Sequence, residues 1–384
     1  MTEFGFVSAG RIIFGPGVSR RLPGISSEFG SRALVVTGAN PDRFADRLEE
    51  VAGALDSLST FEVDSEPSIE LIEKGVSRGR DAGSDVVIAL GGGSVIDAGK
   101  AIAGLLGNAG KLIDYLEVIG GAQPLPKPGL PFIAAPTTAG TGSEVTKNAV
   151  VYSPLHRVKV SFRSPYLIPR VALVDPELTY LLPPGITAAS GLDALTQVLE
   201  PFVSRFANPL TDGICREGLT RAARSIRRVY SDPDNTSRED MSLASLFGGL
   251  ALANAGLGAV HGLAGPLGGL IKAPHGSICA CLLPHVAAEN LRALKSLPDA
   301  SVQLARFREV AQLLTGQPDA QIEEGLNWLI ETCEMLRIPR LSELGLTRAE
   351  IPALVEQSLK ASSMKGNPVD LTADDLATIV DAAF

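Results

Sequence analysis

Hydrophobic residues in the first half of the chain fall into short runs, and most runs are followed by a segment with apolar residues at helical spacing. Short runs rich in β-branched residues predict strands buried on both faces, and a period of three to four residues predicts helices that cover them. The expected strands are 33–37, 58–63, 85–90, 132–135 and 171–174, and the expected helices are 43–55, 69–82 and 95–106. This alternation is typical of a parallel sheet covered by helices.

The pattern changes after the two prolines at 183–184. Few strand-like runs remain, and long segments rich in Ala, Leu, Glu and Arg continue to a last helical pattern at 373–383. We therefore expect an α/β domain over residues 1–180 and an all-helical domain over residues 181–384.

Composition and charge narrow the class of protein. A chain of 384 residues is longer than one hydrophobic core usually serves, and 45% hydrophobic with 20% charged residues is ordinary for a globular enzyme. The net charge of -9 gives no basic field that would attract phosphodiesters or anionic lipids. We expect no nucleic-acid partner and no membrane partner.

The cysteines and the N-terminus indicate a cytoplasmic protein. Four cysteines are too few for a disulfide framework in a chain of this length, which suits a reducing compartment. The N-terminal residues lack the basic start and apolar core of a signal peptide.

One long segment, Met241–Ile271, contains no Asp, Glu, Lys or Arg and is longer than a membrane span requires. Eight glycines, Asn254, His261 and Pro266 interrupt it. Polar groups and helix breakers suit helices buried in protein around a site, so we interpret the segment as core.

A glycine-rich turn follows the strand expected at 85–90. Its residues are Gly91, Gly92, Gly93 and Ser94. Glycines between a strand and a helix let backbone N–H groups approach a pyrophosphate, and the helix N-terminus favours its charge. The turn is not Gly-x-Gly-x-x-Gly, so a tight turn without a ligand is the alternative. Asp97 and Lys100 follow on the helix, and we include Asp97 among the candidate cofactor residues.

A second polar turn follows the strand expected at 132–135, and its hydroxyls and glycines can hold ribose and amide groups. The candidate residues are Thr137, Thr138, Thr141 and Ser143. Two such turns at adjacent strand ends define one nucleotide crevice.

These two turns and three further motifs together resemble the iron-containing (group III) alcohol dehydrogenase family. The further motifs are Ser190-Gly-Leu-Asp-Ala-Leu-Thr196, His261-Gly-Leu-Ala-Gly-Pro-Leu-Gly-Gly269 and Pro274-His275-Gly276. All five stand in the family's order within residues 91–285. The resemblance implies a dehydroquinate-synthase-like fold, in which an N-terminal domain binds NAD(P) and an all-helical C-terminal domain binds metal and substrate. It also implies a homodimer.

The resemblance further implies a divalent metal, Fe²⁺ or Zn²⁺, which the family holds with one Asp and three His. Asp193, His261 and His275 match three of these ligands, and Gln197 stands where the family has the third histidine. Asp193 and Gln197 are four residues apart and share a helix face, so the amide oxygen can still face a metal. An amide is a weaker ligand than imidazole, so we expect lower affinity. Without the resemblance, each histidine is better interpreted as a hydrogen-bonded core residue than as a ligand.

The spacing His275-x-x-x-Cys279-x-Cys281-x-x-x-His285 offers a structural zinc site as an alternative. On a helix, however, Cys279 and Cys281 face apart and cannot converge on one ion. We therefore assign both cysteines to packing.

A second departure from the family lies one helical turn after His261, where Gly265 replaces a histidine that is a candidate proton carrier. The proton then has to travel through cofactor ribose hydroxyls, through a side chain such as Thr141, or through water in the vacated space.

Cofactor preference depends on the end of the strand expected at 33–37. NAD-preferring relatives usually carry an Asp there that repels a 2'-phosphate, and this chain has Gly38, with Arg43 nearby in sequence. We therefore expect NADP to be used at least as well as NAD.

Lys159, in a hairpin expected over 150–162, matches a family lysine that reaches the cofactor ribose; the alternative is an ordinary exposed lysine.

The resemblance implies hydride transfer between NAD(P) and a small alcohol or aldehyde, with Asp193, His261 and His275 holding the metal that polarises the carbonyl. A metal-independent reductase resembling maleylacetate reductase is the nearest alternative: Asp193 disfavours it, while Gln197 and Gly265 leave it open. Glycerol-1-phosphate dehydrogenase and dehydroquinate synthase fit the threonine-rich turn less well. A catalytically impaired nucleotide-binding sensor would also explain both departures.

Overall fold

The computed structural model describes residues 3–384, which form two compact units. The first unit consists of residues 8–138 and 142–181. The second consists of residues 182–384 together with residues 3–7 and 139–141. The predicted fold class, an α/β domain joined to an all-helical domain, is confirmed.

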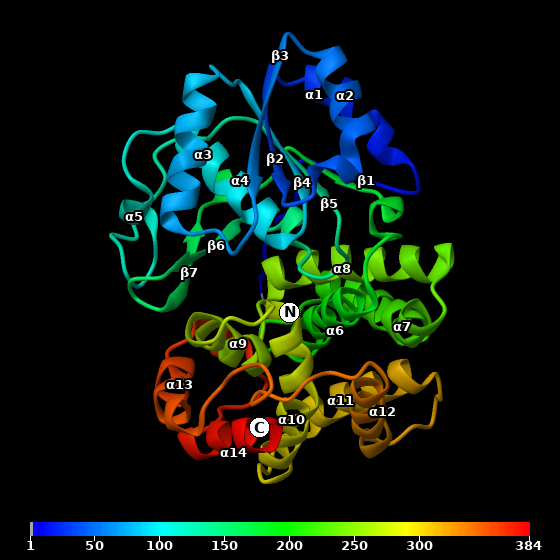
Figure 1. Cartoon of the computed structure of the whole chain (residues 1–384). Coiled ribbons are helices and arrows are strands. Elements are labelled where there is room, and N and C mark those ends of the chain that lie inside the picture. The colour runs from blue at the N-terminus through cyan, green and yellow to red at the C-terminus, as the bar shows by residue number, and fades with distance from the viewer. Residues whose placement is uncertain (1–2) are drawn as a thin grey trace. The chain divides into compact units, whose positions relative to one another are not determined.

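The first unit is built on a six-stranded parallel sheet in the order β1-β8-β5-β4-β2-β3 (Figure 1). Its strands are β1 (Arg11–Phe14), β2 (Arg32–Gly38), β3 (Ser57–Val63), β4 (Val86–Gly91), β5 (Phe132–Pro136) and β8 (Val171–Val174). Strand β1 was not among the expected strands, because its four residues are only partly covered and give a weak apolar pattern. It pairs in register with β8 at the edge of the sheet.

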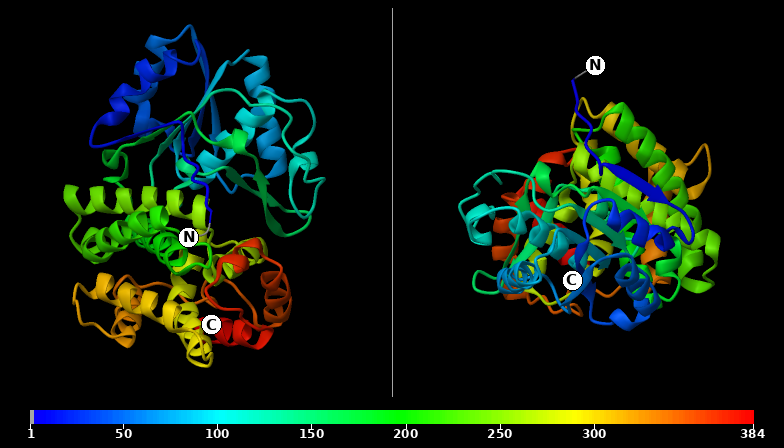
Figure 2. Two further views of the ribbon diagram at one scale, coloured as in Figure 1. Left: turned by 180° about the vertical axis from the view of Figure 1, so that it is seen from behind. Right: turned by 90° about the horizontal axis from the view of Figure 1, so that it is seen from above.

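Helices cover both faces of this sheet, as Figures 1 and 2 show. Alternate residues of β2 belong to separate core clusters: Leu34 and Val36 lie with α3 and α4, whereas Ala33 and Val35 lie with α1 and α2. The helices are α1 (Leu22–Ser27), α2 (Ala45–Ala54), α3 (Ile69–Asp81), α4 (Gly93–Leu106) and α5 (Leu112–Tyr115). Burial on both faces explains why the central strands read as unbroken apolar runs.

Shorter elements complete this unit. The predicted hairpin is present as the antiparallel pair β6 (Asn148–Ser153) and β7 (Val158–Arg163). The 3-10 helices are η1 (Val18–Arg21), η2 (Pro41–Phe44), η3 (Ser143–Val145), η4 (Pro165–Leu167) and η5 (Pro176–Thr179).

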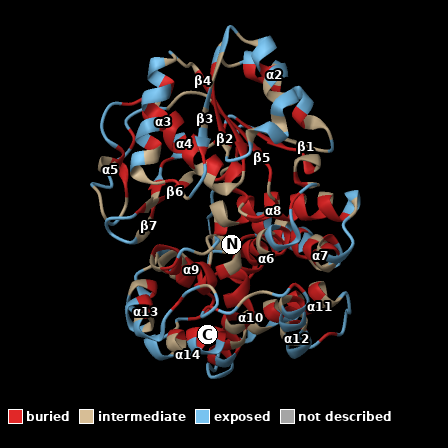
Figure 3. Ribbon diagram, in the orientation of Figure 1, coloured by how far each residue is buried: buried red, intermediate tan, exposed pale blue. Residues whose placement is uncertain are grey.

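The second unit is helical and is organised around α6 (Pro184–Val203), which packs against α7, α8 and α10. Figure 3 shows that α6 and α10 are largely buried, and their apolar residues belong to one core cluster. The other helices are α7 (Pro209–Ser231), α8 (Asn235–Ala255), α9 (Ala259–Leu270), α10 (His275–Lys295), α11 (Ser301–Thr315), α12 (Ile322–Met335), η6 (Arg348–Glu350), α13 (Ile351–Leu359), η7 (Ser362–Gly366) and α14 (Ala373–Ala383).

The apolar segment 241–271 forms most of α8 and all of α9, and its apolar residues contribute to the core cluster, as predicted. Within the described residues, no single helix has the length and apolar character of a membrane span. Helices α8 and α9 meet that criterion only when they are taken together, and the pair is bent by 99°.

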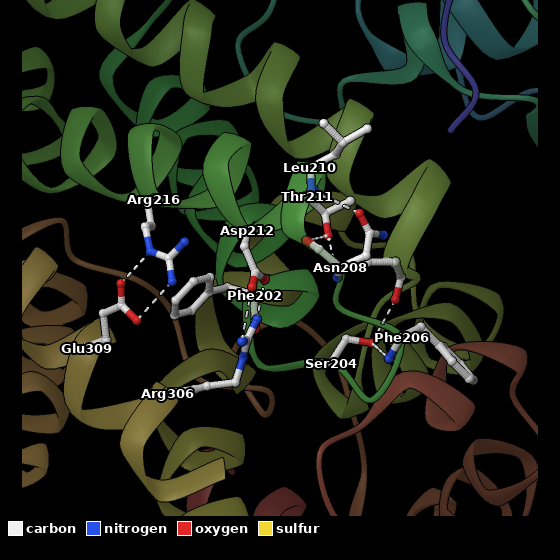
Figure 4. A network of polar contacts seen from close by, with 11 residues as sticks. Phe202, Ser204, Phe206, Asn208, Leu210, Thr211, Asp212, Arg216, Arg306 and Glu309 are labelled. Carbon is white, nitrogen blue, oxygen red and sulfur yellow. Dashed lines mark hydrogen bonds and ion pairs between the residues drawn. The ribbon is translucent and has the colours of Figure 1, made fainter. Parts of the chain in front are cut away.

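A network of arginines fixes the C-terminal end of α6 (Figure 4). Arg306 of α11 donates from Nε to the carbonyl oxygen of Phe202 at 2.7 Å and also pairs with Asp212 of α7. The guanidinium carbons of Arg306 and Arg216 lie 4.6 Å and 5.3 Å from the centroid of the Phe202 ring. Because Arg216 also pairs with Glu309 of α11, helices α6, α7 and α11 are tied together at this point.

Candidate active site

Helix α6 brings two polar side chains into the interior of the helical unit. Asp193 and Gln197 lie one helical turn apart and are 1% and 2% exposed. Burying a carboxylate and an amide in an apolar interior is unfavourable unless partners satisfy them. Their position therefore requires a compensating group.

Two histidines come from the starts of the neighbouring helices. His261 lies in the first turn of α9, and His275 is the first residue of α10. A Cβ at Gly276 would lie 2.5 Å from the carbonyl oxygen of Ala189, so glycine lets α10 begin in close contact with α6. This close approach places His275 beside Asp193.

The structure brings Asp193, His261 and His275 together. Nε2 of His261 lies 3.4 Å, and Nε2 of His275 4.0 Å, from Oδ1 of Asp193. The two imidazole rings are tilted, with centroids 5.5 Å apart. Ligand atoms of these three residues and of Cys279 all lie within 4.8 Å of one another. The four residues form a group with the composition of a metal site.

Cys279 packs in the helical core, as interpreted from the sequence, and this geometry also places its thiol beside the two histidines. Its Sγ lies 3.5 Å from Nε2 of His275 and 3.8 Å from Nε2 of His261. Cys281 faces away and donates to the carbonyl oxygen of Ala383 at 3.6 Å, so the two cysteines do face apart. The sequence signal was present, because Cys279 is one helical turn after His275.

Two buried oxygen atoms of the group have no hydrogen-bond partner among residues 3–384: Oδ1 of Asp193 and Oε1 of Gln197. Nε2 of Gln197 is already bound, because it donates to the carbonyl oxygen of Gly140 at 3.1 Å. A buried acceptor without a donor is rare and calls for an ion or a water. Buried oxygens without hydrogen-bond donors, beside two imidazoles and a thiol, fit a divalent metal ion.

Glu200, one turn beyond Gln197 on α6, fixes His261. Its Oε2 lies 2.7 Å from Nδ1 of His261, and its Oε1 accepts from the N–H of Val260 at 2.7 Å. Because an ionised carboxylate can only accept, we assign a proton to Nδ1, so Nε2 is the ring nitrogen that faces Asp193 and that a metal would bind once it is deprotonated. Sequence reasoning missed Glu200, although the spacing 193, 197 and 200 marks one helix face.

The electrostatics of the group favour a cation. Burial raises the pKa of Asp193, but the facing His261 and His275 outweigh burial, and the pKa lies below its usual range. Burial lowers the pKa of His261, but Cys279, Glu200 and Asp193 raise it well above the ordinary value. Burial raises the pKa of the Cys279 thiol to about 12.

The position of Gly265, one turn after His261, is open. A Cβ at Gly265 would meet no atom within 4 Å. The side chain that the family commonly places here has therefore not been replaced by a neighbouring residue, and water can enter the space.

In the α/β unit, the two glycine-bearing turns lie side by side. The N–H of Thr137 donates to the carbonyl oxygen of Gly91 at 2.9 Å, and a Cβ at Gly92 would lie 3.4 Å from Cγ2 of Thr138. Gly93 and Ser94 begin α4 directly after β4. The backbone N–H groups of this helix start can therefore receive a phosphate.

Asp97 and Ser143 are placed in an internal network around Lys100. The buried ammonium group of Lys100 donates to Ser143 Oγ at 2.7 Å, Thr146 Oγ1 at 2.8 Å and the carbonyl oxygen of Asn148 at 2.9 Å. Asp97 accepts from the hydroxyl of Ser143. These contacts fix α4 to η3 and β6. Both side chains therefore help to hold in place the helix that begins at the glycine turn.

Gly38 ends β2 beside the glycine turn, and a Cβ there would lie 3.8 Å from Cγ2 of Val95, an ordinary contact. The position has room for a side chain.

Lys159 lies on β7 with its Nζ 2.8 Å from Oε1 of Glu66, and its side chain is only 5% exposed. It is therefore not an ordinary exposed lysine.

Family comparison agrees with the fold and the geometry of the site. Residues 9–176 match the family described as iron-containing alcohol dehydrogenase, and residues 187–384 match the C-terminal domain of the Fe-containing alcohol dehydrogenase family. The chain belongs to the iron-containing alcohol dehydrogenase family. It is an oxidoreductase of the alcohol dehydrogenase and aldehyde reductase class.

Individual relatives support the same assignment. Alcohol dehydrogenase 4 of Saccharomyces cerevisiae is 35% identical over 320 residues, which cover 83% of this chain and 81% of the relative. The crystal structure of a 1,3-propanediol oxidoreductase matches with a TM-score of 0.92 and 31% identity over 100% of both chains. The sulfoacetaldehyde reductase of Bifidobacterium kashiwanohense, in complex with NAD+, matches with a TM-score of 0.87 and 27% identity over 100% of this chain and 99% of that one.

Proposed function

We propose that this enzyme transfers a hydride between NADPH and a small aldehyde, with a divalent metal, Fe²⁺ or Zn²⁺, held by Asp193, His261 and His275 and approached by Gln197. The observation that carries the proposal is that one buried oxygen each of Asp193 and Gln197 lacks a hydrogen-bond donor, and that the Asp193 oxygen lies beside two histidine nitrogens. A divalent cation at this position supplies Lewis-acid polarisation of the carbonyl group and stabilises the charge on its oxygen.

The residues of the helical unit position the reacting groups. Asp193 and the two histidines supply donors from three different helices, so their relative placement depends on the core and not on a mobile loop. Glu200 keeps the His261 ring oriented with Nε2 toward Asp193. The proton needed to complete the alcohol passes through water in the open space at Gly265, through Thr141 or through the cofactor ribose.

The α/β unit supplies the nucleotide site in this proposal. The backbone of Gly91, Gly92 and Gly93 and the hydroxyl of Ser94 receive the pyrophosphate, and Thr137 and Thr138 hold the ribose and amide groups. Because Gly38 carries no carboxylate, a 2'-phosphate is not repelled, so NADP is used at least as well as NAD. Lys159 reaches the ribose only if it leaves Glu66.

Assembly and location complete the proposal. We propose a homodimer in the cytoplasm; family membership supports the dimer, and four free cysteines support a reducing compartment. Light scattering of the purified protein would test the dimer, and a monomer mass would contradict it.

The decisive experiment is metal analysis of anaerobically purified protein, paired with an aldehyde panel read by NADPH consumption. Bound metal, together with turnover that is lost on chelation, supports the proposal. Full turnover without metal would instead establish a metal-independent reductase of the maleylacetate reductase kind, which Gln197 and Gly265 would explain. Binding of NADPH without turnover of any aldehyde would indicate a nucleotide-binding protein that has lost catalysis.

A further inference from the structure

Cys279 lies within the metal group, yet the function proposed above does not use it. We propose that Sγ of Cys279 is a ligand of the divalent metal and supplies the donor that the chain lost when Gln197 replaced a histidine. This inference rests on the proposed metal at Asp193, His261 and His275. It gives the site a sulfur donor in place of the third imidazole.

The distances between donor atoms match a tetrahedral metal site. Metal–nitrogen and metal–oxygen bonds of about 2.0–2.1 Å and a metal–sulfur bond of about 2.3 Å separate pairs of ligand atoms by roughly 3.3–3.6 Å. The sulfur of Cys279 lies 3.5 Å and 3.8 Å from the two Nε2 atoms of His275 and His261. The corresponding oxygen–nitrogen distances from Asp193 are 4.0 Å and 3.4 Å. Small side-chain movements therefore suffice to close the four donors on one ion.

The orientation of Cys279 differs from that of the other sulfurs on and near its helix. Cys281 and Cys333 point their thiols at the backbone carbonyl oxygens of Ala383 and Ala280, at 3.6 Å and 3.5 Å. Such contacts are ordinary for cysteines that pack in a core. Cys279 instead faces two ring nitrogens, and Nδ1 of one of these rings is held by Glu200.

The coordinating atoms alone are charge-balanced by a thiolate. A carboxylate from Asp193 and a thiolate from Cys279 together neutralise a dication, while the negative charge of Glu200 lies behind His261 and does not touch the ion. A coordinated thiol is deprotonated by the metal, and its proton is released to solvent on binding. A thiolate in place of an imidazole moves the preference of the site toward Zn²⁺, because soft ligands suit zinc better than a harder Fe²⁺.

X-ray absorption spectroscopy of the zinc-loaded full-length protein in thiol-free buffer tests this inference without measuring activity. We expect a zinc–sulfur shell at about 2.3 Å beside the shorter nitrogen and oxygen shell. The sulfur shell should vanish in Cys279→Ser and persist in Cys281→Ser, which changes another buried cysteine two residues away on the same helix. With Co²⁺ in place of zinc, wild type and Cys281→Ser should show thiolate-to-cobalt charge-transfer absorption, and Cys279→Ser should not.

The outcomes separate this inference from the proposed function. Zinc bound with nitrogen and oxygen neighbours alone, in the wild-type protein, would overturn the role of Cys279 and leave the metal proposal intact. A wild-type protein that retains no metal would overturn both. The wild-type spectrum alone decides whether sulfur is bound to the metal, so the inference remains testable even if Cys279→Ser does not fold.

Discussion

The carboxylate of Glu200 holds His261 from the side opposite Asp193, with Oε2 2.7 Å from Nδ1 of the imidazole. The same carboxylate anchors the first turn of α9 through the N–H of Val260. One acidic residue of α6 therefore sets both the orientation of a metal-ligand candidate and the start of the helix that carries it. Gly258, at the N-cap of α9, is required for this arrangement, because a Cβ there would lie 2.9 Å from Oε1 of Glu200.

Replacing this carboxylate by an amide should weaken metal binding. In Glu200→Gln the charge behind His261 is lost while the volume is kept, and removal of such a partner typically costs about 10–100-fold in metal affinity. Competition with a chromogenic chelator would measure the loss. Glu289→Gln is the matched control, since Glu289 is also buried in the helical unit but pairs with Arg292. Equal affinities in wild type and Glu200→Gln would contradict the role given to Glu200.

Restoring a histidine at position 197 should strengthen metal binding. Gln197→His replaces an amide oxygen by a better donor for iron or zinc, but it gives up the hydrogen bond to the carbonyl oxygen of Gly140. We expect the metal-free variant to lose about 1 kcal/mol of unfolding free energy and the metal-loaded variant to recover it. Thermal melts with and without metal measure both effects. Gln197→Ala loses the same hydrogen bond without gaining a donor, so recovery there would argue against ligation at this position.

A carboxylate at position 38 should change the cofactor preference. In Gly38→Asp the new charge would face a 2'-phosphate, and like charges brought together cost several kcal/mol, so kcat/KM for NADPH should fall more than about tenfold. NADH should be affected far less, because its ribose offers a hydroxyl that the carboxylate can accept from. Gly38→Asn has the same shape without the charge and serves as control. If NADPH kinetics were the same in both variants, position 38 would not face the 2'-phosphate.

Stability should fall as pH rises through the range in which Glu144 titrates. Burial raises the pKa of Glu144 from 4.5 to about 7, against the opposing effects of a backbone hydrogen bond and Lys100. The folded state therefore binds this proton more tightly than the unfolded state, and stability present below pH 4.5 is lost as pH rises through 7. The loss is on the order of 3 kcal/mol.

The neighbouring lysine titrates at higher pH, so the two effects are separable. Burial lowers the pKa of Lys100 to about 8, which means that the unfavourable charge is relieved only above that value. Urea unfolding at pH 5 and pH 7.5 should show a smaller fall for Glu144→Gln than for wild type. The exposed substitution Glu356→Gln should leave the fall unchanged. An identical fall in Glu144→Gln would show that another group is responsible.

The sheet could be predicted from local pattern, because a strand buried on both faces reads as an apolar run. Strand β8 was expected at its observed bounds, and β4 and β5 within one residue. Strand β1 was missed because its stability comes from pairing with β8, a partner more than 150 residues away. Such non-local pairing leaves little trace in four residues of sequence.

The metal group could be predicted only in part. The shared helix face of Asp193 and Gln197 follows from their spacing. The meeting of His261 with His275 does not, because it depends on how closely α10 approaches α6, which the contact between Gly276 and Ala189 sets. Only the family resemblance connected those histidines. Cys279 was assigned to packing because the zinc motif that contains it was rejected on the divergence of Cys279 and Cys281, and the pair of Cys279 with His275 alone was not weighed.

The cofactor-binding residues could be predicted from the sequence only in part, for a different reason. Asp97 was chosen because it follows the glycine turn on the helix, and Ser143 because it lies in the second polar turn, but spacing does not reveal whether a side chain faces a ligand or the interior. In the structure, Lys100 donates to Ser143, and Ser143 donates to Asp97. Both residues therefore help to satisfy the buried charge of Lys100. Polar residues near a phosphate-binding turn can therefore stabilise the position of the turn without contacting the cofactor.

Hydride transfer in this enzyme depends, in the proposed mechanism, on metal bound at Asp193, His261 and His275. The most direct test returns metal stepwise to chelated enzyme and follows bound metal and NADPH-dependent aldehyde reduction in the same samples. We expect turnover to rise in proportion to occupancy and to level off at one metal per chain, and His275→Ala to recover neither metal nor turnover. Full turnover in metal-free wild-type enzyme would contradict the account.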